Sequence, residues 1–326
     1  MGWEVAIGID VSKRTLDVVL LRGNDALHAQ FDNTPAGFIQ LGTWLRRRQA
    51  VAIPVCLEAT GVYSEAVAVF LHEAGYEVSV VNPARTKAYA DSRLNRQKTD
   101  KTDALVIAQF CQTQQPARWQ PPDPAQRELQ ALVRQLCALQ GMYRQEQNRL
   151  EASRTSEAVS TMLCQHLAFL EQQMEEMQHL IRNLIECHPD LKRQHDLLDT
   201  IPGLGETTIA TLLAEIPDIR AFDTAPQLAA YAGVTPRHYR SGTSVHGRTR
   251  MSKRGNALLR VALYFPAMVA LRHNPIIRAF GERLKASGHA PKSIIGAAMR
   301  KLLHLVFGVL KSGRPFDPAY SSQVVA

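Results

Sequence analysis

Hydrophobic and polar residues along the first part of the chain follow the alternation that is typical of β-strands. Residues 3–22 hold two apolar, β-branched runs with a polar turn at Ser12 to Arg14, and residues 26–31 form a third run. Beyond them the pattern predicts a helix over 35–48, a strand over 51–57, a helix over 64–74, a strand over 76–81 and helices over 85–92 and 103–112. Strands followed by alternating helices and strands predict a mixed α/β fold built in layers.

A proline-rich stretch and a long apolar repeat divide the rest of the chain. Four prolines between Pro116 and Pro124 end the α/β region. Apolar residues then recur at alternating intervals of four and three residues, at Leu163, Leu167, Leu170, Met174, Met177, Ile181 and Leu184, and the stretch from Leu129 to Tyr143 behaves similarly. This repeat is typical of coiled-coil helices, which pair with each other or with another subunit. The sequence therefore predicts an α/β domain at 1–122, a coiled-coil connector at 123–190 and a mainly α-helical basic domain at 191–326.

Charge is segregated along the sequence. Residues 224–326 hold 16 Lys and Arg but only two acids, a formal charge of +14, whereas residues 1–223 carry −6. No acid occurs between 224 and 281, so a merely solubilising basic surface explains this pattern less well than a polyanionic partner does. The C-terminal region is therefore expected to bind nucleic acid through phosphate neutralisation.

The remaining composition indicates a cytoplasmic protein. Five cysteines show no C-x-x-C pair and no spacing shared with histidine, which argues against zinc and against a disulfide framework. The first residues lack the pattern of a signal peptide. Apolar runs near the C-terminus are interrupted by polar or helix-breaking residues, so no membrane span is expected; these are Arg260, Pro266, Arg300, Lys301 and His304.

A glycine-rich turn marks the entry to the basic domain. The sequence I-P-G-L-G-E-T-T-I at 201–209 predicts a short helix, a turn with Gly203 and Gly205, and a second helix, as in a helix-hairpin-helix. In that motif the backbone amides of the turn bind a DNA phosphate without reading sequence. A plain hairpin between two helices fits the same residues.

Four acids are candidates for a metal site. Asp10 lies inside an apolar strand, Glu58 ends the predicted buried strand, and Asp100 and Asp103 lie three residues apart at a helix start, so that both face one side. Carboxylates of this kind suit Mg²⁺, which polarises a phosphoryl oxygen. Simpler explanations remain, since Asp100 or Asp103 would also serve as a helix cap and Glu58 as a surface acid.

The segment 237–254 combines hydroxyls with basic residues. Its cations, which would surround a phosphodiester, are Arg237, Arg240, Arg248, Arg250, Lys253 and Arg254. Its candidate nucleophiles are Tyr239, Ser241, Thr243, Ser244, Thr249 and Ser252. Spacing does not choose among them, and Tyr239 with its Arg and His neighbours also fits a tyrosine recombinase.

Several of these stretches together resemble one family. G-I-D-V-S-K, L-E-A-T-G-V-Y, K-T-D-K-T-D-A, I-P-G-L-G and K-S-G-R-P-F-D occur in an order, over nearly the whole chain, that is similar to the DEDD transposases of insertion sequences. Their N-terminal domain resembles the RuvC Holliday-junction resolvase. The resemblance implies an RNase H-like fold that binds Mg²⁺ through Asp10, Glu58, Asp100 and Asp103. It also implies recombination guided by a structured RNA that the element encodes, within a homotetramer made of two dimers.

The resemblance also singles out one nucleophile. Family members carry a catalytic serine in a P-R-x-Y-x-S-G context, which corresponds to Ser241, and this implies strand exchange of donor and target DNA through a phosphoserine intermediate. Arg93, Arg96 and Lys98 are expected to contribute to RNA binding. Two alternatives stay open. One is a hydrolytic nuclease that uses the same acids with water, and the other is a non-catalytic nucleic-acid-binding protein in which the acids are structural.

Overall fold

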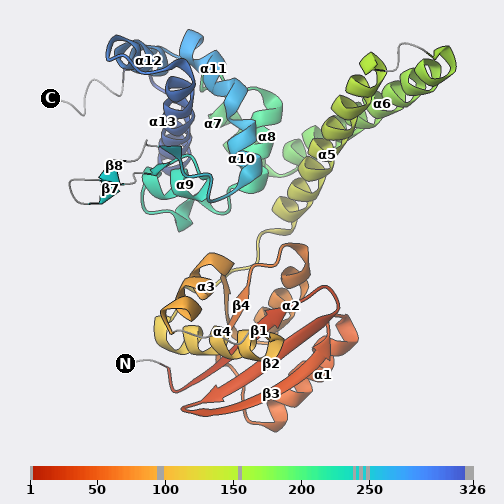
Figure 1. Ribbon diagram of the computed structural model, residues 1–326, viewed down its shortest axis with the longest axis vertical. Coiled ribbons are helices and arrows are strands. Elements are labelled where there is room, and N and C mark those ends of the chain that lie inside the picture. The colour runs from red at the N-terminus through yellow and green to blue at the C-terminus, as the bar shows by residue number, and fades with distance from the viewer. Residues whose placement is uncertain are drawn as a thin grey trace. The chain divides into compact units, whose positions relative to one another are not determined.

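The computed structural model describes residues 3–93, 99–152, 156–237, 240–241, 245–246 and 250–319. The chain divides into two compact units, Met1–Pro121 and Pro122–Ala326 (Figure 1). Each buried apolar cluster among the described residues lies on one side of this division. Each unit therefore has a hydrophobic core of its own.

The first unit is built on a five-stranded mixed sheet with the order β3-β2-β1-β4-β5. Strands β1 (Val5–Val11), β2 (Thr15–Arg22) and β3 (Asp25–Asp32) form the antiparallel part, and β4 (Pro54–Glu58) and β5 (Glu77–Val81) run parallel to β1. This is the RNase H-like mixed fold that the sequence predicts. The fourth strand starts at Pro54 rather than at Val51, because Val51 is 57% exposed and Ala52 takes a positive φ of 54°, which ends the extended path.

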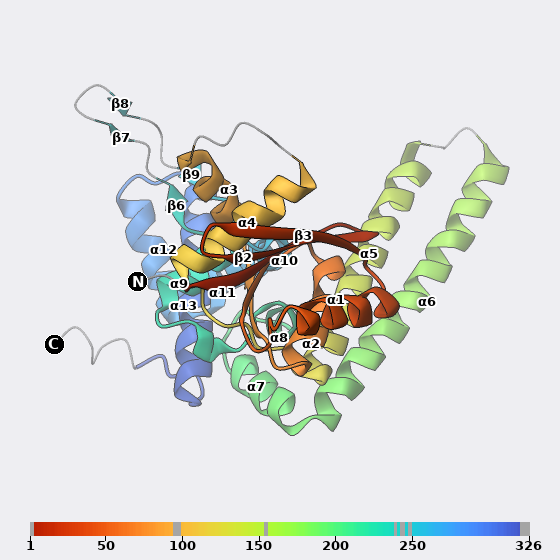
Figure 2. The same ribbon diagram turned by 90° about the horizontal axis from the view of Figure 1, so that it is seen from below.

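Helices cover both faces of this sheet. On one side lie α1 (Pro35–Arg47) and α2 (Val62–Glu73), and on the other lie α3 (Pro83–Ser92) and α4 (Asp100–Gln114) (Figure 2). Alternate residues of each central strand face opposite sides. In β1, Ile7 and Ile9 pack with α1 and α2, whereas Ala6 joins the cluster that contains Ile107 of α4.

The second unit is mainly helical, as predicted. It begins with α5 (Pro124–Ala152) and α6 (Glu157–Cys187), which fold back on each other as an antiparallel hairpin (Figures 1 and 2). The helices that follow are α7 (Pro189–Asp199), α8 (Glu206–Glu215), α9 (Ala225–Tyr231), α10 (Ala257–Ala262), α11 (Tyr264–His273), α12 (Pro275–Ala286) and α13 (Pro291–Ser312), with a 3₁₀ turn η1 (Ile219–Ala221). Two short ladders interrupt them. One pairs β6 (Pro236–Arg237) with β9 (Arg250–Met251), and the other pairs β7 (Arg240–Ser241) with β8 (Val245–His246).

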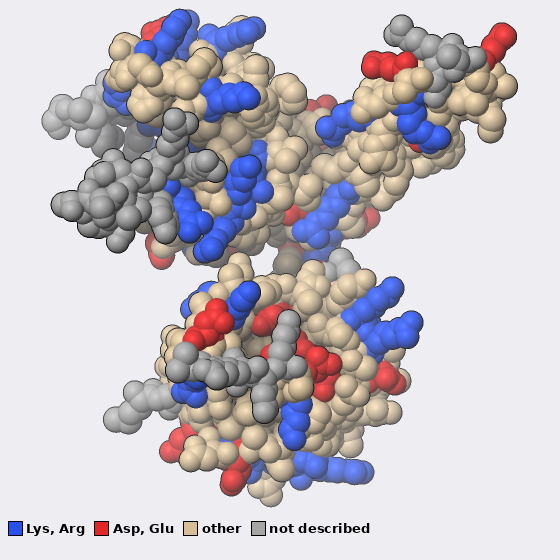
Figure 3. Space-filling view, in the orientation of Figure 1, with Lys and Arg blue, Asp and Glu red and all other residues tan. Residues whose placement is uncertain are grey.

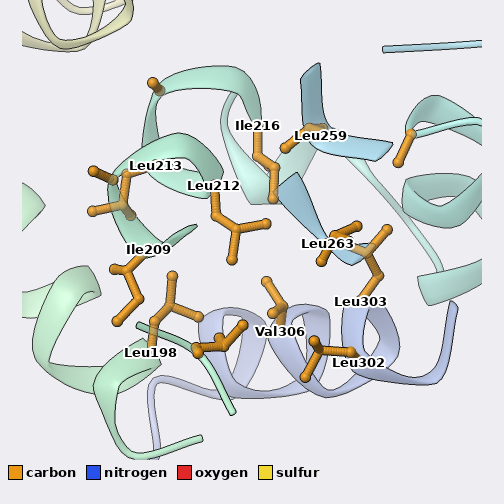
Figure 4. Close-up of a cluster of buried hydrophobic side chains, with 14 of the residues drawn as sticks. Leu198, Ile209, Leu212, Leu213, Ile216, Leu259, Leu263, Leu302, Leu303 and Val306 are labelled. Atoms are coloured by element: carbon orange, nitrogen blue, oxygen red, sulfur yellow. The ribbon is translucent and has the colours of Figure 1, made fainter. Parts of the chain in front are cut away.

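Helix α13 is long and apolar enough to cross a membrane by length and composition alone. Its apolar side chains instead form much of the core of the second unit. Leu302, Leu303 and Val306 are fully buried and face Leu198 of α7 and Leu263 beside α10 in one cluster (Figure 4). Packing against neighbouring helices therefore accounts for its composition.

A buried ion pair ties three helices of the second unit together. The Glu215 side chain is almost fully buried at the end of α8 and accepts hydrogen bonds from Arg134 of α5, at 2.7 and 3.1 Å, and from Asn256 Nδ2, at 2.7 Å. We expect Arg134→Leu to lower the free energy of unfolding by ~3 kcal/mol, because it leaves a buried charge without its cation. Denaturant unfolding measures the loss. The control is Arg182→Leu, which removes an exposed pair with Glu206 and should cost less than ~1 kcal/mol; equal losses would contradict the prediction.

Candidate active site

Asp10 and Glu58 come together at one edge of the sheet. Strands β1 and β4 are parallel neighbours with Ile9 opposite Leu57, so the next residues along each strand, Asp10 and Glu58, are also neighbours. Because Ile9 and Leu57 face α1 and α2, the two acids face the side covered by α3 and α4. The register alone thus places both carboxylates on one face, at the carboxyl ends of two adjoining strands.

Close packing of α4 on β1 adds the other two acids. A Cβ atom on Gly8 would lie 2.2 Å from the Ala108 nitrogen and 2.3 Å from the Ala104 oxygen, so the helix backbone rests directly on the strand. Asp100 and Asp103 occupy the first turn of this helix, just before Ala104. The small residues at the contact therefore bring the start of α4 over the end of β1 where Asp10 lies.

The start of α4 is capped by threonines and not by either aspartate. Thr99 accepts a hydrogen bond from the Thr102 backbone amide, and the Thr102 hydroxyl accepts one from the Thr99 amide, which together make a capping box. The simpler reading of Asp100 or Asp103 as the helix cap is therefore wrong. Both carboxylates also lie at the positive end of the helix dipole, which favours negative charge there.

The electrostatics of Asp10 show that the predicted acids gather around it. The pKa of Asp10 is raised to about 6, mainly by burial and then by the charges of Glu58, Asp103, Asp100 and Asp17, in that order. Four of these five residues are the ones that the sequence singles out, and Asp17 is an addition. Acids this close destabilise one another, and a cation among them would relieve the repulsion.

The four acids lie near one another, but in their present positions they do not form a complete set of metal ligands. Among the described residues, no three His, Cys, Asp or Glu side chains are close enough to ligate one ion in their present positions. Glu58 accepts a hydrogen bond from the hydroxyl of Thr86, a buried residue of α3, which fixes one of its oxygens. The donors of this set are all oxygen atoms, which are the ligands that divalent cations such as Mg²⁺ prefer.

The segment around Ser241 is described only in part. Ser241 lies in β7 opposite Val245 of β8, and the structure describes the backbone of Arg240 and Ser241 but not their side chains. The side chain of Arg250 is likewise not described, and four predicted residues lie outside the described part of the chain: Tyr239, Arg248, Arg96 and Lys98. Arg237, Lys253 and Arg254 are described and reach the surface.

The structure has the predicted glycine turn before α8, but the need for a glycine at position 203 comes from close packing. Gly203 has a φ of 107°, and a Cβ atom there would lie 2.8 Å from the Ala270 Cβ of α11. Close packing therefore explains Gly203, whereas a Cβ on Gly205, the residue before α8, would meet open space. The predicted phosphate contact remains a prediction for the helix start at Gly205.

We expect Gly8→Ala to distort the candidate site, although the substitution replaces none of the four acids. The added methyl group overlaps backbone atoms of Ala104 and Ala108, which cannot rotate away, so α4 must move off the sheet. Thermal or denaturant unfolding of the first unit should show a loss of ~3 kcal/mol. Gly141→Ala in α5, where the methyl group meets open space, is the control and should be neutral or slightly stabilising. A first unit of unchanged stability would show that α4 is not held as described.

Charged side chains differ between the surfaces of the two units. Acidic side chains gather on one part of the visible face of the first unit, with Lys and Arg around them, and Lys and Arg together with some acids are spread over the visible face of the second unit (Figure 3).

Comparison with known proteins gives two family matches and several relatives. A DEDD transposase family of the IS110 type matches residues 7–153, and the Transposase IS116/IS110/IS902 family matches residues 195–282. The chain is 36% identical to the pilin gene-inverting protein of Moraxella lacunata over 314 residues, covering 95% of this chain and 97% of the relative. The corresponding protein of Moraxella bovis is 35% identical over the same length. An uncharacterized 43.6 kDa protein of insertion element IS110 from Streptomyces coelicolor is 30% identical over 50% of this chain and 39% of its own.

Proposed function

The chain belongs to the IS110 family of DEDD transposases, and we propose on this basis that it exchanges DNA strands through a covalent phosphoserine intermediate at Ser241 with the help of Mg²⁺. Membership makes the protein a transposase or DNA recombinase. The nucleophile and the metal are the parts that we propose. The observation that carries the metal part is that Asp10 and Glu58 end adjoining parallel strands, and that the first turn of α4 with Asp100 and Asp103 packs over the same end of the sheet.

The four acids would hold the cation. Mg²⁺ bound there would neutralise the negative charge of the scissile phosphate and of the oxygen that leaves it. Asp10 and Glu58 contribute from the rigid sheet, Asp100 and Asp103 from the first turn of α4, and Thr86 keeps Glu58 oriented. A site supported by strands, a helix start and a second hydrogen-bonded residue keeps its geometry while DNA binds.

Ser241 would supply the covalent step. Its Oγ forms a bond to phosphorus, its proton goes to solvent, and the deoxyribose oxygen leaves as a free hydroxyl once it has gained a proton. Attack on the phosphoserine by a hydroxyl of another strand reverses these changes and restores the serine, so the bond energy is kept. The surrounding cations, among them Arg237, Lys253 and Arg254, would hold the phosphate.

The experiment that tests this function compares the products of strand cleavage. The protein is expressed from its own locus with its flanking noncoding DNA, purified, and incubated with that DNA and Mg²⁺. A labelled strand that migrates with the protein on a denaturing gel, and is released by protease, supports the proposal. Free nicked ends without an adduct would show a hydrolytic nuclease, and binding without cleavage would show a non-catalytic protein.

A second candidate outcome of strand exchange is inversion of a DNA segment. It is favoured by the two Moraxella relatives named as pilin gene-inverting proteins, which match nearly the whole chain. Inversion and insertion use the same chemistry and differ in how the strands are rejoined. Amplification and sequencing of the new junctions distinguishes them, because inversion reverses a segment in place whereas insertion creates a junction elsewhere.

We also propose that a structured RNA encoded beside the gene guides the choice of DNA. The support is the resemblance to the family and the strongly basic C-terminal region. Arg93 ends α3 with its guanidinium 5.0 Å from the Tyr89 ring and with a hydrogen bond to Gln109 of 3.2 Å, so this predicted RNA contact is held in place. Sequencing the nucleic acid that copurifies with the protein tests the proposal, and recovery of random cellular RNA alone would contradict it.

A homo-oligomer is the proposed assembly, and the hairpin offers a surface for it. Val159, Met162, Phe169 and Leu180 lie exposed along one face of α6, at spacings that continue a heptad, and Met162 is 70% exposed. This face is separate from the one that packs on α5. An apolar helix face of this kind fits a second copy of the same hairpin.

We expect Phe169→Glu combined with Met162→Glu to reduce the assembly to smaller species, because two charges would be buried in the interface. Light scattering after size-exclusion chromatography measures the mass. The control is Ala168→Glu, which adds a charge at an exposed position on another face of α6 and should leave the mass unchanged. An unchanged mass of the double variant would place the contact elsewhere.

A further inference from the structure

A fifth carboxylate lies beside the four acids. Asp17 is 4% exposed in the middle of the sheet, in strand β2. In the antiparallel pairing of β1 and β2, Asp17 stands directly opposite Asp10. Side chains in such a pair point to the same face, with Cβ atoms about 4.5–5.5 Å apart. Asp17 therefore faces the site from the strand on the other side of Asp10 from Glu58.

Both oxygens of Asp17 are anchored from the edge strand. Nε2 of His28 donates a hydrogen bond of 2.8 Å to Oδ1, and Nε2 of Gln30 donates one of 3.0 Å to Oδ2. Both donors belong to β3. One hydrogen bond to each oxygen holds the carboxylate against β3, so that it does not turn freely out to solvent or into the site. It is a fixed negative charge.

The place of this charge calls for an explanation. Two like charges directly opposite each other in a ladder destabilise it, and the only ion-pair partner that the described residues give Asp17 is His28. If its task were only to fasten β3 to the sheet, a neutral asparagine would do so at lower cost, with its Oδ1 accepting from His28 and its Nδ2 donating to the Gln30 side-chain oxygen once that amide has turned over. His28 is positively charged only when it is protonated, so a divalent cation beside Asp10 would be the partner that offsets the charge of Asp17 when His28 is neutral.

We propose that Asp17 is a positioning residue of the metal site, an anchored carboxylate beside Asp10 whose negative charge strengthens the binding of the divalent cation without ligating it. The inference rests on the proposed function, since it takes the four acids to be the ligands. Residues that act on a metal from behind its ligands commonly change its affinity 10-fold or more. His28 and Gln30 act one step further out, by holding Asp17.

The test is cation binding by the full chain without DNA, so that it does not depend on activity. Mg²⁺ and Mn²⁺ are titrated by calorimetry, and thermal unfolding is followed with and without the ion. For Asp17→Asn we expect an affinity at least ~10-fold weaker than that of the wild type. We also expect that its thermal midpoint without metal does not fall, because the repulsion with Asp10 is gone. Asp25→Asn, at the exposed start of β3, is the matched control and should bind like the wild type.

The outcomes separate three cases. An affinity within twofold of the wild type, together with a lower midpoint in the absence of metal, would show that Asp17 only fastens β3 and would overturn the inference. If the wild type itself binds neither ion, the proposed metal site fails, whatever Asp17 does. Asp17→Thr, which also removes the charge and suits a strand, is the second variant should Asp17→Asn not fold, and the same weakened affinity is expected of it.

Discussion

Asp10→Asn is expected to slow Mg²⁺-dependent strand cleavage by on the order of 1,000-fold or more. It is also expected to stabilise the metal-free first unit at neutral pH. The first effect follows because Asp10 is the centre on which the other acids converge. The second follows because the substitution removes a buried charge that its neighbours repel. Binding to DNA should stay within ~3-fold of the wild type, since the predicted phosphate-binding cations from Arg237 to Arg254 are in the second unit. A variant that still cleaves would contradict the assignment.

The raised pKa of Asp10 also predicts whether the stability of the first unit rises or falls with pH. The pKa of Asp10 is about 6 in the folded protein against an ordinary 3.8, so the folded state binds the proton more tightly. Its contribution to stability is therefore present below about pH 4 and is lost as the pH rises through about 6. Without metal, the thermal midpoint of the wild type should fall over this range relative to that of Asp10→Asn. Added Mg²⁺ should restore it in the wild type only, and a midpoint difference that does not change with pH would be the contrary result.

Ser241→Ala is expected to remove the covalent protein–DNA adduct completely, because alanine has no hydroxyl group that could attack phosphorus. Binding of DNA and Mg²⁺ should be unchanged. The adduct is measured on denaturing gels before and after protease. Tyr239→Phe is the matched control, since it removes the hydroxyl of the rival nucleophile two residues away and should leave the adduct in place. Loss of the adduct with Tyr239→Phe, and its persistence with Ser241→Ala, would make the protein a tyrosine recombinase.

Most of the first unit could be predicted from local sequence patterns. The turn at Ser12 to Arg14 and the alternation on either side of it predict the first hairpin because strand periodicity and turn residues are local properties. The start of β4 could not be predicted in this way. The apolar run begins at Val51, but the positive φ of Ala52, which no pattern of apolar residues reveals, delays the strand to Pro54.

Some residues of the candidate site could likewise be predicted from local patterns, and others could not. Asp10, Glu58, Asp100 and Asp103 stand out because each occurs at a strand or at a helix start in a recognisable order. Asp17 carries the same local signal, an acid within an apolar strand, but its importance depends on the register that sets it opposite Asp10. Gly203 shows the converse, since the sequence indicates a phosphate-binding turn and the structure explains the glycine by its contact with Ala270. Contacts between residues distant in sequence account for both differences.

The division of the apolar cores at residues 121 and 122 has a consequence for how this protein can vary. Because neither half needs the other to complete its interior, a chimera that joins the first unit of one homologue to the second unit of another should keep both folds. Any loss of recombination in such a hybrid would then report a mismatch in how the halves cooperate on DNA, and not a failure to fold. Natural recombination between related mobile elements has the same freedom, so the two halves can be inherited as separate modules.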